Sequence, residues 1–290
     1  MNSCSEKNQE TCKKFQLIDG VLQFSQVIII SLLSLLLPVA FLLLARITTA
    51  QYLISVAVFQ QTEDFSVLAS FFFSSHARWL QYGLVGVITC LAFVNILDGN
   101  LVQMWQSSDN VSIRRSCVYH VSCWIFLCAF QVLVCFGLEG SIYSGIDASG
   151  FGLENDWLRR VVVFLGLHET MRFCSKMVVK PVVDDTLFGH VREERWVEKA
   201  ALAFSFGMFW WWRLRDEVEA LVVLVEVKRM LEVGIGIGDF FGWSLYYLVV
   251  AIGVARVGKS LLWIGGVVWQ CGVEVNKLNN SYICDIDETV

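Results

Sequence analysis

Charged residues and proline are scarce in this 290-residue chain. Only 17% of its residues are charged and proline occurs twice, whereas 56% are hydrophobic and the mean hydropathy is +0.59. Soluble domains are typically about 25% charged and about 45 to 50% apolar. The composition therefore excludes an ordinary soluble domain and predicts a membrane protein.

Basic clusters and cysteine ligand motifs are missing as well. The net charge is −5, and no block rich in lysine and arginine is interleaved with aromatic residues, which excludes a nucleic-acid-binding surface. The ten cysteines form no CxxC pair and have no Cys/His spacing for zinc. We interpret most of them as small buried apolar residues.

Catalytic motifs are absent too. The run HETMR at residues 168–172 is not HExxH, because Arg172 stands where the second histidine belongs, and the run beginning at Asp184 lacks the DDxxD pattern. Asp184 and Asp185, which follow Pro181, are predicted to form a turn and a helix cap. No nucleophile elbow, Walker loop or dinucleotide fingerprint occurs. We therefore expect no enzyme, no metal and no cofactor.

Four apolar runs approach the length of about 20 residues that crosses a bilayer. They cover residues 21–45, 79–97, 117–138 and 240–257. Pro38 is predicted to kink the first run and Arg46 to end it. Asp239 is expected to be the N-cap of the last.

Two further segments are ambiguous. Residues 158–183 can form a helix that crosses the bilayer or lies along it, and residues 196–212 suit a tilted or interfacial helix ending in three tryptophans. Residues 218–227 carry helical and β-branched signals together. We expect an all-α membrane protein with four to five transmembrane helices per protomer.

Lysine and arginine predict the orientation. Arg114 and Arg115 follow the second span, and the N-terminal tail also carries lysines, whereas residues 139–157 contain no basic residue. This places the N-terminus in the cytosol. The glycosylation sequon at Asn110 would require the opposite side, and the sequon at Asn279 is usable with an odd number of spans.

The chain divides by composition into six parts. They are a cytosolic tail (1–20), a three-span membrane bundle (21–138), an acidic luminal loop (139–157), a charged helical region with one further span and cytosolic helices (158–233), the last span (239–258) and a C-terminal tail (259–290).

A polar stripe follows the third apolar run. At 100° per residue its members share a wedge of about 100°. They are Cys117, His120, Cys128, Gln131, Cys135 and Glu139. In one interpretation the stripe lines a conduit, with Glu139 attracting cations at its luminal mouth. In the other, the same small and polar face packs against neighbouring helices.

Two other polar groups lie in or beside the apolar runs. Asn95 and Asp98, three residues apart, form either a vestibule or a helix end that reaches water. One face of the first run, about 140° wide, carries Gln23, Gln26, Ser31, Ser34 and Pro38. We expect its serines to bond to their own backbone.

A charged wedge marks residues 158–183. On a helix it spans about 120°. Its members are His168, Glu169, Arg172, Lys176 and Lys180. Because the wedge is net positive, we expect it to face acidic partners or lipid headgroups beside a cation path rather than inside one.

The run RVVVFLGLHETMRFCSKMVVKPVVDDTLFG at residues 160–189, with the order of spans, acidic loop and charged middle, carries a resemblance. The chain resembles a family of small plant polytopic membrane proteins of mostly unknown role, and its overall layout resembles the WeiTsing-like calcium-permeable cation channels of the endoplasmic reticulum. The resemblance implies a symmetric homo-oligomer, a pentamer, with a central pore, calcium as permeant ion and a role in plant defence signalling. It assigns no site residue.

The expected function is therefore an oligomeric calcium-permeable cation channel of an internal membrane, with lipid and further copies of the chain as partners. The alternative is a membrane-anchored scaffold whose charged region 192–232 binds a cytosolic partner.

Overall fold

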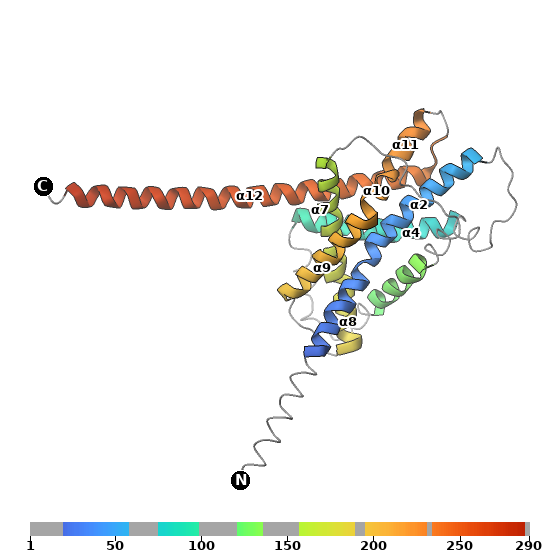
Figure 1. Cartoon of the computed structure of the whole chain (residues 1–290), viewed down its shortest axis with the longest axis horizontal. Coiled ribbons are helices and arrows are strands. Elements are labelled where there is room, and N and C mark those ends of the chain that lie inside the picture. The colour runs from blue at the N-terminus through green and yellow to red at the C-terminus, as the bar shows by residue number, and fades with distance from the viewer. Residues whose placement is uncertain are drawn as a thin grey trace, which may run out of the picture.

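The computed structural model describes residues 20–57, 75–98, 121–135, 157–188, 195–230 and 234–287, and every regular element in these residues is helical (Figure 1). The labelled α-helices are α2 (Leu36–Ala57), α4 (Ser75–Asp98), α7 (Trp157–Cys174), α8 (Lys180–Val183), α9 (Trp196–Phe209), α10 (Arg215–Val218), α11 (Ala220–Met230) and α12 (Ile237–Asp287). Residues 20–34 and 121–135 are also helical. The π-helical segments are η3 (Ser175–Val179), η4 (Asp184–Phe188) and η5 (Trp210–Leu214). The all-helical prediction is confirmed for the described residues.

Three helical stretches are long and apolar enough to cross a membrane. They are Gly20–Tyr52, Trp79–Asp98 and Ile237–Trp269. Within the predicted third span the structure describes an apolar helix, Val121–Cys135, which is shorter than a full crossing. The described chain thus has the make-up of a multi-pass membrane protein.

The first long helix is irregular close to its proline. The N–H of Leu35 is shared between the carbonyl oxygens of Ser31 and Leu32, at 3.3 and 3.2 Å. Pro38 has no N–H and its ring crowds the carbonyl group four residues earlier, which explains why the helical ladder is disturbed here. The prediction that Arg46 ends this helix is wrong, because α2 continues to Ala57.

The charged segment forms one helical path from Trp157 to Phe188 that alternates between α and π geometry. A π turn is wider than an α turn, and η3 and η4 lie on either side of Pro181. Asp184 and Asp185 begin η4, so the expected turn and cap at these residues are not found. The helix predicted over 158–183 is present and extends farther in both directions.

The helices α7 and α12 cross with their backbones in contact. A Cβ atom on Gly166 would overlap the carbonyl oxygen of Val249, and a Cβ atom on Gly253 would overlap the carbonyl oxygen of Val162. Small residues allow such close approach between membrane helices, where Cα–H groups meet carbonyl oxygens. Neither glycine can be enlarged without moving backbone.

The same α12 lies beside α4, and the two run in one direction. Trp79 packs edge-on against Phe241 with ring centroids 5.3 Å apart near the start of both helices. Near the end of α4, Lys259 Nζ donates a hydrogen bond to the carbonyl oxygen of Ile96. Beyond Lys259, α12 extends away from the other helices (Figure 1).

The start of α12 differs from the expected one. The helix begins at Ile237, and Asp239 is its third residue rather than its N-cap. Asp239 Oδ2 accepts a hydrogen bond of 3.0 Å from the Gly236 N–H. In a capping box the side chain at the third helical position accepts a hydrogen bond from the N–H of the N-cap residue, which here is Gly236.

Replacing Gly253 with alanine tests the helix crossing. We expect Gly253→Ala to destabilise the protein by about 1 to 3 kcal/mol, because overpacking against backbone forces the helices apart. Gly258 is the matched control on α12, since nothing lies within 4 Å of the Cβ it would gain. Gly258→Ala should be neutral or stabilise by up to about 1 kcal/mol through helix propensity. Thermal unfolding in detergent measures both, and equal midpoints would contradict the crossing.

Candidate functional site

The predicted polar stripe faces outward in the part that the structure describes. Helix Val121–Cys135 has one buried line, made of Cys123, Leu127, Phe130 and Val134. These residues are four, three and four positions apart, as on one face of a helix. Gln131 and Cys135 are exposed beside this buried line, and Cys128 is half-buried. His120 and Glu139 lie outside the described residues. This face therefore does not pack against the described core of its own chain.

The side chain of Lys259 lies at the C-terminal end of α4. Asp98 is exposed, and Asn95 Oδ1 is buried without a hydrogen-bond partner among the described residues. Lys259 donates to the carbonyl oxygen of Ile96 between them. A positive charge is favourable at a helix C-terminus. The arrangement fits a capped helix end better than a vestibule for cations.

Most residues of the charged wedge contact other residues of the same chain. Glu169 lies 3.8 Å from Arg172 and 3.7 Å from Arg256 on α12. Lys180 Nζ lies 3.3 Å from Glu198 Oε2 at the start of α9. His168 packs among aromatic rings, with its centroid 5.6 Å from that of Phe206. Of the wedge residues, Lys176 is exposed.

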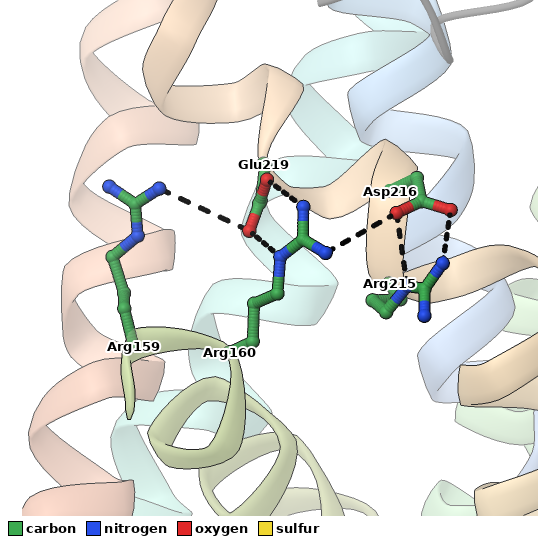
Figure 2. A network of polar contacts seen from close by, with 5 residues as sticks. All are labelled: Arg159, Arg160, Arg215, Asp216 and Glu219. Carbon is green, nitrogen blue, oxygen red and sulfur yellow. Dashed lines mark hydrogen bonds and ion pairs between the residues drawn. The ribbon is translucent and has the colours of Figure 1, made fainter. Parts of the chain in front are cut away.

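A network of polar contacts joins α7 to the segment η5–α10–α11 (Figure 2). Arg160 Nε and Nη2 donate to the two carboxylate oxygens of Glu219 at 2.8 and 3.1 Å. Arg160 Nη1 also lies 3.8 Å from Asp216 Oδ1, and the same oxygen accepts a hydrogen bond of 3.0 Å from Arg215 Nε. Arg159 Nη2 lies 4.0 Å from Glu219 Oε1. The hydrogen bond with Glu219 raises the pKa of Arg160, which stays charged. Two-point pairing of this kind fixes orientation as well as distance.

A second carboxylate in this segment holds the first long helix. Arg46 Nε and Nη2 donate to Glu217 Oε2 and Oε1 at 2.6 and 2.9 Å, and Arg213 Nε lies 2.7 Å from Glu217 Oε1. The Glu217 side chain is only 2% exposed. A charge within an apolar helix is costly unless it is paired, so this contact explains how α2 continues past Arg46.

Two further buried contacts join distant elements. Lys228 Nζ lies 2.8 Å from both carboxylate oxygens of Asp239, which ties the last turn of α11 to the first turn of α12. Gln26 Nε2 donates to Asp184 Oδ1 at 2.6 Å. Asp184 Oδ2 is buried and has no hydrogen-bond partner in the described part of the chain.

The polar face of the first helix is also used inside the chain. Gln23 Oε1 accepts a hydrogen bond of 2.7 Å from Arg195 Nη1. Ser34 Oγ donates a hydrogen bond of 2.6 Å to the carbonyl oxygen of Ile30. The expectation that this serine bonds to its own backbone is confirmed. Together with Gln26, these contacts make the face a packing surface rather than the wall of a path.

The buried network was not predicted from the sequence. The spacing of Arg213 and Glu217, four residues apart on a helix, is a local signal for one of its pairs. The pairs of Arg46 with Glu217 and of Arg160 with Glu219 join residues 171 and 59 positions apart. No local pattern carries that information. No group of three or more metal-ligating residues gathers among the described residues.

The chain matches no protein-family model, and no curated protein or solved structure is significantly similar to it. The resemblance to plant calcium-permeable channels therefore stays a prediction, and the function is argued from the placement of the residues.

Removing Glu217 tests the network. Glu217→Ala removes the buried carboxylate that pairs with Arg46 and Arg213. Breaking a buried pair in this way costs about 3 to 5 kcal/mol. Glu226 on α11 is exposed and serves as the matched control. Glu226→Ala should change stability by less than about 0.5 kcal/mol. Unfolding midpoints in detergent report the difference, and a Glu217→Ala protein as stable as the control would show that the pair is not needed.

Proposed function

We propose that this chain is the subunit of an oligomeric cation channel in an internal membrane. The observation that carries the proposal is the outward face of helix Val121–Cys135, where Gln131 and Cys135 are exposed on an otherwise apolar helix.

A glutamine on the outer surface of a membrane helix needs a polar neighbour. Polar side chains in a bilayer face a bundle interior or a water-filled path, because lipid offers no hydrogen bond. The described core of one chain covers the neighbouring line of Cys123, Leu127, Phe130 and Val134 and leaves Gln131 and Cys135 exposed. Further copies of the chain, arranged around an axis, would supply the missing neighbours and enclose the path.

An acidic residue follows on the same face by sequence. Glu139 comes four residues after Cys135, and it lies outside the described residues. One carboxylate from each copy would form a ring that concentrates cations at the mouth. Calcium as the permeant ion, five copies, the endoplasmic reticulum and defence signalling rest on the resemblance to the plant channels.

The scaffold alternative has less support from the placement of charges. In region 192–232, Arg213, Glu217, Glu219 and Lys228 are engaged in ion pairs within the chain. Among the described residues of this region Arg195, Lys199, Glu226 and Arg229 are exposed. Because the charges held in ion pairs are not available to a partner, we favour the channel.

Planar-bilayer recordings of the purified oligomer test the proposal. We expect calcium currents that fall by up to about tenfold in Glu139→Gln, since acidic mouths raise the local cation concentration by about that factor or more. Gln131→Leu should also lower the current by making the path apolar. Glu226→Gln removes an equal charge elsewhere and should leave the current unchanged. A well-folded oligomer without conductance would refute the channel.

A further inference from the structure

The outer half of α12 begins with an apolar segment, Leu261–Trp269, that the described core does not cover. From Leu261 to Trp269 every residue is exposed, with Leu262, Trp263 and Trp269 at 78%, 71% and 76%. The helix has 51 residues, which makes it about 75 Å long. Figure 1 shows this half reaching far beyond the other helices. An isolated helical segment of this kind is marginal in water.

A heptad pattern runs along this half of α12. Apolar residues recur with alternating spacings of three and four over about three heptads. They are Leu261, Ile264, Val268, Cys271, Val275, Leu278 and Tyr282. We call this line the α12 seam.

The α12 seam is the face that stays apolar along the whole segment. Before Gln270 the sequence is apolar at nearly all positions, so lipid or protein would suit it equally. After Gln270 the other heptad positions, apart from Val273, carry polar residues or glycine, including Glu274, Asn276, Lys277 and Asn280, while the seam continues to Tyr282. Lipid would surround all sides alike, whereas a partner helix covers one line. The pattern favours a helix.

A second copy of the same helix fits this line. Between Leu261 and Tyr282 the charged residues are Glu274 and Lys277, and neither lies on the seam, so identical helices bring no like charges together. The next seam position after Tyr282 is Asp285, where self-repulsion would end the contact. Copies inserted in one membrane share one orientation, and α12 contains a candidate span, so their outer halves run in parallel.

We propose that the α12 seam joins copies of this chain as a parallel, in-register helical bundle. This deepens the proposed oligomer by naming a surface that holds it together. The seam requires self-association in a membrane and does not require conduction, so the two proposals can fail separately.

Disulfide cross-linking of the membrane-embedded native protein tests the register. Cys271 lies on the seam and Cys284 lies off it. Oxidation with copper phenanthroline should yield a reducible dimer that is lost in Cys271→Ser and kept in Cys284→Ser. Loss in Cys284→Ser with retention in Cys271→Ser would overturn the seam. A second outcome would also overturn the seam, namely that a membrane-impermeant maleimide labels neither Cys271 nor Cys284 until detergent is added. That result would place the whole segment in lipid.

The particle mass in detergent gives an independent reading. Leu278→Lys places a charge on the seam and should reduce the mass toward that of one 32.9 kDa chain, whereas Asn280→Lys, off the seam, should keep the native mass. A monomeric native protein, or equal masses for the two variants, would overturn the seam. Cross-linked oligomer without calcium current would refute the channel alone, and current that persists in monodisperse Leu278→Lys oligomer would refute the seam alone.

Discussion

The backbone contact between α7 and α12 is the constraint on which the rest of the described structure depends. Gly166 and Gly253 leave no room for a side chain at the crossing, so the two helices meet at one place and in one orientation. From this contact, Arg160 on α7 reaches Glu219, and Glu169 reaches Arg256 on α12. Since α12 also lies beside α4, the same crossing positions two of the candidate membrane spans.

Buried ion pairs specify how the remaining segments dock. Glu217 holds α2, Glu219 holds α7, and Lys228 holds Asp239 at the start of α12. Taking these charges out of water is costly, and such pairs contribute specificity more surely than stability. They select one arrangement of apolar helices that would otherwise pack in many ways. The charged residues in the middle of the chain therefore mainly join helices of the same chain.

Two surfaces are proposed for contacts with other copies. One is the face of helix Val121–Cys135 with Gln131 and Cys135, and the other is the α12 seam. Both carry residues that the chain's own described core does not cover. The first bears on conduction and the second on assembly, which is why the oligomer and its pore are separable questions.

The sequence by itself determined the helical class, the three described spans and the helix over the charged wedge, because apolar periodicity and length are local properties. It also indicated the irregularity near Pro38. It failed where partners are distant. Local spacing predicts a helix end at Arg46 and a turn at Asp184, because Glu217 and Gln26 come beside them only when the helices dock. The tertiary structure alone decided which charges are buried and which polar stripe faces outward. Those outcomes depend on contacts between residues far apart in the chain, which local spacing does not encode.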